Sequence, residues 1–384
     1  MKLPFSFIFI SLCFNPSVCW AFSTIPNEVH GIKKQHTEVL PRNSDSNQDE
    51  LLQTEHAPVA ISTRQQFLRI AFAGIGVCAG LGSNPMRSSA FCGDPYPQWA
   101  FMLNFNDGVI PYKGSDLYIR EIGSERREKT LKLHPLVVIP GGPGFSHDYL
   151  ETIEAVAQTE RRVLLFDPLG TGQSSKKAGP FSTVDLVDQV NALLKAIGVK
   201  EYHLYAHGSG VAAALEKLKQ VRQKAGGEKI LSLTCASPFE KGKDLISSFS
   251  EKSWKENPEA KKQLLNNRKV TPICVEESLK TSSSLQYTET FLNLENWDCS
   301  PFMEYVTCPV TITYGRNDLV PESSVLGFKS QITASTPVQT KCFEKSGHLA
   351  HLDEKEEYLQ FLQDFLNKVD DDIDSKGNKN KKSK

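Results

Sequence analysis

The sequence predicts an α/β fold with a mostly parallel eight-stranded sheet, helices on both faces and a short helical cap. Two observations predict it. Six short apolar runs alternate with segments of helical periodicity, a pattern typical of strands that are buried on both faces. The run at 201–206 is followed by a tight glycine-rich turn at 208–210 and then by helix-forming residues at 211–221.

The composition of the 384-residue chain is that of a globular protein, with 39% hydrophobic and 23% charged residues. The formal net charge of −1 gives no field that would attract nucleic acid or anionic lipid, so we expect neither as a partner. The nine cysteines show no CxxC or histidine-rich metal spacing. We therefore expect buried free thiols, no metal and no cofactor, with one or two disulfides in an oxidising compartment.

The first segment of the chain has the features of a secretory signal peptide. Met1–Ala21 combines Lys2, an apolar run at 3–13 and a small residue before Phe22, where cleavage is expected. Trp20–Ser23 also resembles the Ala-Phe cleavage box of algal complex-plastid presequences, such as those of diatoms. Residues 23–62 are polar and aperiodic, as in a disordered transit segment.

A second targeting segment completes residues 22–90. Ile70–Gly82 is apolar but too short to span a bilayer. It follows Thr63–Arg69 and precedes the small residues near Ala90, and this order resembles a twin-arginine thylakoid signal with Gln65 in place of the second arginine. We expect a plastid of the algal complex type, with the thylakoid lumen as the final compartment and secretion as the alternative.

The remaining chain supplies the strands in order. Trp99–Asn104 and Leu117–Ile122 alternate around Asn106-Asp-Gly108, which predicts an antiparallel hairpin. Six buried strands follow, at 136–140, 162–167, 201–206, 230–236, 309–315 and 338–343, and 183–196 has helical periodicity. The predicted domain organisation is a core at 91–237 and 304–369, a cap at 238–303 and a disordered charged tail at 370–384.

The strand, turn and helix at 201–221 predict a nucleophile elbow, in which small residues lie two places before and after the nucleophile. Ala206 and Gly210 are the small residues, so the nucleophile position falls on Gly208. In the alternative frame Ser209 is the nucleophile, and the larger His207 and Val211 occupy the crowded positions.

Motifs after the strands resemble those of the proline iminopeptidases, a family of α/β-hydrolases. They are Gly141–Leu150, Asp167–Ser174, Asn293–Asp298, Gly315–Asp318 and Ser346–His348, and the resemblance covers about residues 98–368.

This resemblance implies that Asp318 is the catalytic acid and His348 the base. It also implies an oxyanion hole from Gly141, Gly142 and Ser209, whose backbone N–H groups would face a developing negative charge. The candidate substrate-binding residues are His207, Phe145, Trp297 and Tyr287, of which His207 is equally compatible with a packed position beside the elbow. His351 is expected to be solvated or supporting, and the turn at 167–174 to be structural.

Two departures from the family bear on the substrate. Pro140 replaces the histidine that usually opens the HGGPG motif, and the cap is short. Tyr287 falls where the family's cap carries a glutamate that grips the free amine of the substrate. Without that carboxylate, the preference for an aminopeptidase substrate loses its electrostatic basis.

Three functions follow. The first is an enzyme whose Asp318–His348 dyad performs hydrolytic or general acid–base chemistry on a small ester, amide or apolar metabolite. The second is a non-catalytic pseudo-hydrolase that binds a ligand or assembles with other proteins, such as a thylakoid complex. The third is a serine hydrolase or aminopeptidase that uses Ser209. The oligomeric state is not predicted.

The targeting interpretation makes a prediction about processing. If both segments are removed during import into the thylakoid lumen, the mature protein begins near residue 91. Mass spectrometry of the N-terminal peptide from the native organism measures this position directly. A mature N-terminus near residue 23 would exclude the lumen.

Overall fold

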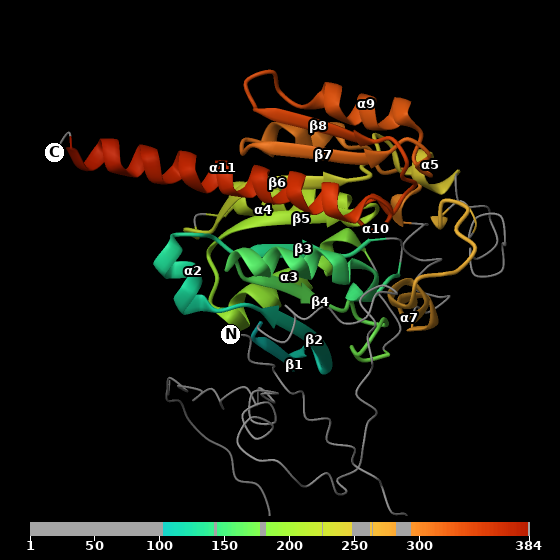
Figure 1. The fold of residues 1–384 in the computed structure, drawn as a ribbon, viewed down its shortest axis with the longest axis horizontal. Coiled ribbons are helices and arrows are strands. Elements are labelled where there is room, and N and C mark those ends of the chain that lie inside the picture. Colours follow the sequence, from blue (N-terminus) through green and yellow to red (C-terminus); the bar gives the residue numbers. More distant parts are fainter. Residues whose placement is uncertain are drawn as a thin grey trace, which may run out of the picture. The chain divides into compact units, whose positions relative to one another are not determined.

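The computed structural model describes residues 103–382, except 142–143, 177–181, 225, 248–261, 263 and 282–292. The described residues belong to one compact unit built around an eight-stranded sheet (Figure 1). The strand order is β1-β2-β4-β3-β5-β6-β7-β8. Among the described helices, none combines the length and apolar character that a membrane span requires.

All six predicted parallel strands are confirmed. The strands are Phe105–Tyr112 (β1), Ser115–Ile122 (β2), Leu136–Ile139 (β3), Val163–Phe166 (β4), Glu201–His207 (β5), Lys229–Ala236 (β6), Val310–Gly315 (β7) and Val338–Phe343 (β8). β1 pairs with β2, and β2 with β4, in antiparallel fashion, whereas every other pair is parallel. Every residue of β3, β4 and β7 is buried, because these central strands are covered on both faces.

The N-terminal hairpin forms, but its turn was predicted in the wrong place. The turn is at Lys113-Gly114, whose φ angles of 47° and 75° match the left-handed pair that a tight hairpin needs. Asn106-Asp-Gly108 lies inside β1 instead, where Gly108 pairs with Ile119. Of the predicted first strand, residues 99–102 lie outside the described residues.

The described helices lie between the strands and after them. They are Glu125–Leu131 (α2), His147–Thr159 (η2), Thr183–Ile197 (α3), Gly210–Gln223 (α4), Gly242–Ile246 (α5), Ile273–Thr281 (α7), Ser300–Tyr305 (η3), Glu322–Gln331 (α9), Ala350–Asp353 (α10) and Lys355–Lys382 (α11). α3 begins with a capping box formed by Ser182 and Asp185 and ends at Gly198, which has a left-handed φ of 76°.

The cap is described only in part. Its helix α7 packs against η2, so it covers the segment that follows the glycine-rich turn. Residues 248–261, 263 and 282–292 of the predicted cap lie outside the described residues.

The predicted disordered tail is wrong as far as residue 382, because α11 continues through it. Asp370 is only 5% exposed and accepts a 2.7 Å hydrogen bond from the buried guanidinium of Arg161. This hydrogen bond attaches Asp370, the first acidic residue of the segment, to the core of the protein. Figure 1 shows α11 as one continuous helix.

Among the described cysteines, Cys235, Cys299, Cys308 and Cys342 are free thiols, and the first three are buried, as predicted. Cys274 takes part in a disulfide bond.

The carboxyl ends of β3 and β5 approach each other too closely for side chains. A Cβ atom on Gly141 would lie 1.8 Å from the carbonyl oxygen of His207. A Cβ atom on Gly210 would lie 2.8 Å from the carbonyl oxygen of Pro140. Because real Cβ atoms do not come this close to backbone atoms, only glycine fits at either position.

We predict that Gly141→Ala lowers the free energy of unfolding by at least about 3 kcal/mol, because the new methyl group overlaps backbone that cannot move aside. Chemical denaturation measures the loss. The matched control is Gly108→Ala, where a Cβ atom would meet nothing within 4 Å. That change should alter stability by less than about 1 kcal/mol. Equal losses in the two variants would contradict the close approach.

Candidate active site

The turn between β5 and α4 consists of Gly208 and Ser209. Gly208 has a φ of 51°, in the left-handed region, and its N–H donates to the carbonyl of Ala236 at 2.9 Å. Ser209 has φ −60° and ψ −23°, which is right-handed helical backbone at the start of α4. The left-handed residue at the sharpest point of the turn is therefore Gly208, and a residue with a side chain would be strained there.

Two side chains from later strands form a buried pair. Asp318 follows β7, His348 follows β8, and His348 Nδ1 lies 2.7 Å from Asp318 Oδ1. The Asp318 carboxylate also accepts hydrogen bonds from Ser237 Oγ at 2.6 Å and from the N–H of Val320 at 3.0 Å. Burial alone would raise the pKa of Asp318, but His348 and these donors outweigh it and lower the pKa below its ordinary value. The carboxylate is thus ionised and holds the imidazole in one orientation.

A chain of hydrogen bonds connects the glycine-rich turn to this histidine. The N–H of Gly141 donates to the Tyr149 hydroxyl oxygen at 2.9 Å, and that oxygen lies 3.1 Å from His207 Nδ1. His207 Nε2 lies 3.0 Å from the carbonyl oxygen of His348. Because a carbonyl only accepts, Nε2 carries the proton. Burial, together with His348 and His351, lowers the pKa of His207 far below its ordinary value, so the ring is neutral and Nδ1 accepts from Tyr149.

His207 is therefore a packed histidine that positions its neighbours, and its ring centroid lies 4.7 Å from that of His348. The N–H of Gly141, predicted as an oxyanion donor, is engaged by Tyr149. His351 is buried rather than solvated, and its Nε2 donates to the Tyr149 carbonyl at 3.0 Å. Sequence reasoning missed the part played by Tyr149 because nothing in its motif indicates which partner a buried hydroxyl will find.

A pocket opens above Ser209 and the glycine-rich turn. Its described lining residues are uncharged: Pro140, Gly141, Gly144, Phe145, Pro168, Ser182, Thr183, Leu186, Gln189, Ser209, Asn293 and Leu294. Of the predicted site residues, Phe145, Gly141 and Ser209 are therefore brought together here. Gly142 and Tyr287 lie outside the described residues.

Five described residues of the predicted site lie outside this lining: His207, Gly208, Trp297, Asp318 and His348. His207 is buried as described above, and the side chain of His348 is fully buried as well. Trp297 packs between Phe239 and Phe302, with ring centroids at 5.0 and 6.0 Å. Trp297 thus supports the base of the cap, next to the lining residues Asn293 and Leu294.

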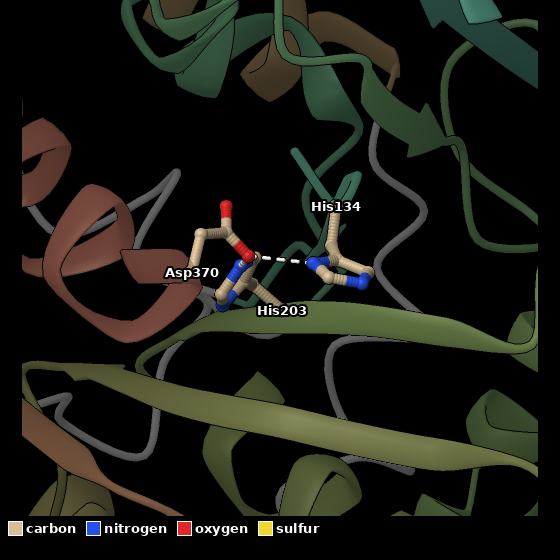
Figure 2. A group of neighbouring side chains, drawn as sticks. All are labelled: His134, His203 and Asp370. Atoms are coloured by element: carbon tan, nitrogen blue, oxygen red, sulfur yellow. Dashed lines mark hydrogen bonds and ion pairs between the residues drawn. The ribbon is translucent and has the colours of Figure 1, made fainter. Parts of the chain in front are cut away.

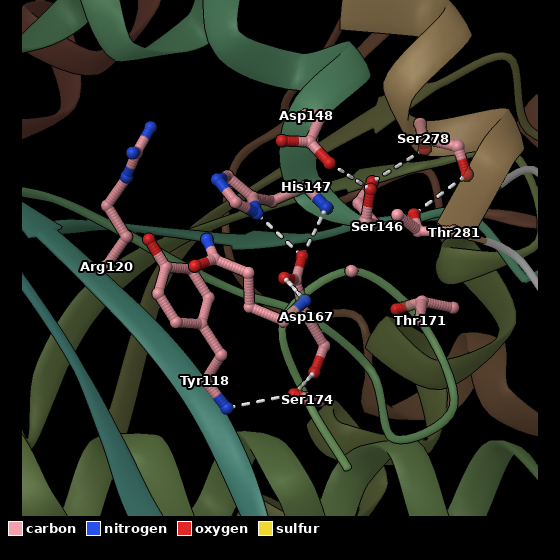
Figure 3. A network of polar contacts seen from close by, with 12 residues as sticks. Tyr118, Arg120, Ser146, His147, Asp148, Asp167, Thr171, Ser174, Ser278 and Thr281 are labelled. Carbon is pink, nitrogen blue, oxygen red and sulfur yellow. Dashed lines mark hydrogen bonds and ion pairs between the residues drawn. The ribbon is translucent and has the colours of Figure 1, made fainter. Parts of the chain in front are cut away.

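A second histidine–aspartate pair fixes the loop that follows the glycine-rich turn (Figure 3). Asp167 Oδ1 accepts from the backbone N–H of His147 at 2.9 Å and lies 2.6 Å from its Nδ1. Asp167 Oδ2 accepts from the N–H of Gln173 at 2.7 Å. Burial lowers the pKa of His147, but the charges of Asp167 and Asp148 outweigh it and raise the pKa to about 9. The turn after β4 is thus tied to the loop beside the pocket.

Two neighbouring buried carboxyl groups on η2 have contrasting surroundings. Glu154 accepts a 2.8 Å hydrogen bond from the guanidinium of Arg120. Glu151 Oε2 has no hydrogen-bond partner within the described part of the chain. Burial raises the pKa of Glu151 to about 8, with a further contribution from Glu154. Glu151 is therefore neutral at pH 7.

This difference predicts how stability depends on pH. The pKa of Glu151 is higher in the folded than in the unfolded protein. The neutral carboxyl group therefore makes its full contribution to the free energy of unfolding below about pH 4, and this contribution is lost as the pH rises through about 8. Glu151→Gln stays neutral and should match the wild type near pH 5. At pH 8.5 it should be more stable by roughly 1–3 kcal/mol, measured by urea denaturation.

The matched control is Glu154→Gln, which breaks the contact with Arg120 and should lose roughly 3 kcal/mol at both pH values. The interpretation of Glu151 is wrong if the Glu151→Gln variant follows the pH dependence of the wild type.

Comparisons with known proteins agree with the observed fold. A family model described as the alpha/beta hydrolase fold matches residues 134–298. The chain is 26% identical over 299 residues to a proline iminopeptidase from Lactobacillus helveticus, covering 69% of the chain and 99% of that protein. It is 27% identical over 300 residues to a proline iminopeptidase from Clostridium botulinum, covering 70% of the chain and all of that protein.

Solved structures show the same fold. The crystal structure of the proline iminopeptidase from Mycobacterium smegmatis superposes with a TM-score of 0.56 and 21% identity, covering 69% of this chain and 98% of that one. The present chain therefore has the α/β-hydrolase fold and is similar in sequence to proline iminopeptidases, which are hydrolytic enzymes.

Proposed function

We propose that this chain is a proline iminopeptidase-like enzyme in which Asp318 and His348 provide general-base catalysis and Gly208 occupies the place of the missing serine nucleophile. One observation carries the proposal: Gly208 is the left-handed residue of the elbow, while the Asp318–His348 pair is intact at 2.7 Å. The site thus has an oriented base, while the left-handed position of the elbow carries no hydroxyl group.

In the proposed reaction, His348 Nε2 removes a proton from a water molecule or from the substrate. Asp318 holds the ring with Nδ1–H toward itself and stabilises the imidazolium that forms. The N–H of Ser209 at the start of α4, together with Gly142, stabilises the negative charge that develops on the substrate oxygen. General-base catalysis of this kind contributes about 10²- to 10⁴-fold in rate.

The lining of the pocket favours an uncharged substrate. An aminopeptidase needs a carboxylate to receive the substrate's free amine, and the described lining residues carry none. Phe145, Leu186 and Leu294 supply apolar contacts, and Asn293 supplies polar groups for orientation. A small ester, amide or apolar metabolite suits this lining better than an amino-terminal peptide.

A specific observation favours each alternative. The full burial of His348 favours a binding protein in which the pocket holds a ligand without turnover, for example within a thylakoid complex. The presence of Ser209 in the pocket lining favours a serine hydrolase, although its helical backbone differs from the left-handed position of Gly208.

We also propose a plastid location, with the thylakoid lumen as the final compartment. The support is the order of the two N-terminal targeting segments. The disulfide at Cys274 suits an oxidising compartment, whether a lumen or the secretory route.

The proposal predicts a large effect of one substitution and a small effect of another on the kcat/KM for hydrolysis of small chromogenic esters. His348→Ala removes the base and should lower kcat/KM by about 10²- to 10⁴-fold. Ser209→Ala keeps the backbone N–H and should change kcat/KM by less than about threefold.

Each other outcome selects a different mechanism. Unchanged turnover in His348→Ala would end the general-base proposal. Loss of turnover in Ser209→Ala would establish the serine mechanism. A folded wild-type protein that turns over no member of a broad ester and amide panel would favour the binding protein.

A further inference from the structure

Three side chains of metal-ligating type meet at the end of the sheet away from the candidate active site (Figure 2). His134 lies just before β3, His203 lies near the amino end of β5, and Asp370 comes from α11. The glycine-rich turn and the elbow follow the carboxyl ends of these same two strands. The cluster and the candidate active site are thus at opposite edges of the sheet.

The distances within the cluster are short. Asp370 Oδ1 lies 2.6 Å from His134 Nδ1 and 3.2 Å from His203 Nε2. One potential ligand atom from each residue lies within 4.8 Å of the other two, and no other group of three such residues meets this criterion in the described part of the chain. His203 and Asp370 are buried, whereas the side chain of His134 is 23% exposed and leaves a route from solvent.

The far nitrogen of each imidazole faces an oxygen atom. His203 Nδ1 lies 2.8 Å from Ser232 Oγ, and His134 Nε2 lies 3.8 Å from a carboxylate oxygen of Glu201. Metal-binding histidines commonly donate their remaining N–H to a neighbouring oxygen in this way, which fixes the ring and its tautomer. Without metal, His134 Nδ1 and His203 Nε2 each donate their proton to Asp370 Oδ1, because a carboxylate oxygen only accepts. Metal binding requires that the N–H of each ring move to the far nitrogen.

Arg161 holds the third residue in place. Its guanidinium donates to Asp370 Oδ2 at 2.7 Å and to Asn367 at 3.0 Å. This leaves Oδ1 as the single ligand oxygen that Asp370 offers. The positive charge of Arg161 opposes a cation nearby, so we expect an affinity on the order of micromolar rather than that of a structural zinc site.

We propose that His134 Nδ1, His203 Nε2 and Asp370 Oδ1 form a binding site for Zn²⁺. Two imidazoles and one carboxylate are a ligand set that zinc accepts, with water in the remaining position. Each ring binds as a neutral imidazole, with its N–H on the far nitrogen, toward Ser232 or Glu201. Bound zinc would connect α11 to the starts of β3 and β5 and so stabilise the C-terminal helix.

The test measures zinc bound to the full-length protein after dialysis in a buffer that holds free Zn²⁺ at about 10 µM. The readout is inductively coupled plasma mass spectrometry. We expect His134→Ala, which replaces a partly exposed side chain, and Asp370→Asn, which preserves the size of the side chain, each to bind one equivalent less than the wild type. Added Zn²⁺ should raise the Tm of the wild type by about 5 °C and that of neither variant.

The matched control is His348→Ala, which also removes a buried histidine paired with an aspartate but belongs to no three-residue cluster. It should bind as much zinc as the wild type. The proposal is overturned if His134→Ala and Asp370→Asn bind as much zinc as the wild type, or if Zn²⁺ leaves the Tm of the wild type unchanged. Either result would leave the cluster as an ion-paired contact that holds α11 without metal.

Discussion

The close approach of backbone at the carboxyl ends of β3 and β5 is the constraint on which the rest of the site depends. Gly141 and Gly210 face carbonyl oxygens of the opposite segment, and neither has room for a Cβ atom. This contact places the glycine-rich turn directly against the elbow. Gly208, the left-handed residue of the turn, lies between the end of β5 and the start of α4, next to this contact.

Hydrogen bonds also connect the glycine-rich turn to His348, the proposed base. Gly141, Tyr149 and His207 are linked by hydrogen bonds that end on the backbone of His348. Asp318 holds the imidazole ring of His348 by a hydrogen bond to Nδ1. Leaving any of these buried groups without a partner would cost about 1–3 kcal/mol, so the base is held from both its ring and its backbone. Such rigidity suits a group that must be positioned before reaction.

The magnitudes favour one class of chemistry. Loss of the nucleophile from a comparable serine enzyme costs about 10⁶ in kcat, which would leave little covalent catalysis. An oriented general base is still worth about 10²- to 10⁴-fold. With the proposed assignment of Gly208 to the nucleophile position, Asp318 and His348 are better suited to water activation or proton transfer than to acyl-enzyme formation.

The sequence correctly predicted the strands and the turn that depend on short-range residue patterns. The apolar runs located six strands, and the sizes of Ala206 and Gly210 identified the turn between β5 and α4. The hairpin turn was misplaced because Asn106-Asp-Gly108 is a strong local turn signal that tertiary pairing with β2 overrides. The helical state of 370–382 could not be foreseen, because the partner of Asp370 is Arg161, 209 positions earlier. The assignment of Gly208 to the nucleophile position stays a prediction.

The most direct test of that assignment is covalent labelling of Gly208→Ser with a fluorophosphonate probe. A serine at this position would face the existing base, at a conformational cost of about 1–2 kcal/mol for the left-handed backbone. We expect Gly208→Ser to be labelled, the label to disappear when His348→Ala is added, and the wild type to remain unlabelled. Labelling of the wild type that is abolished by Ser209→Ala would contradict the assignment.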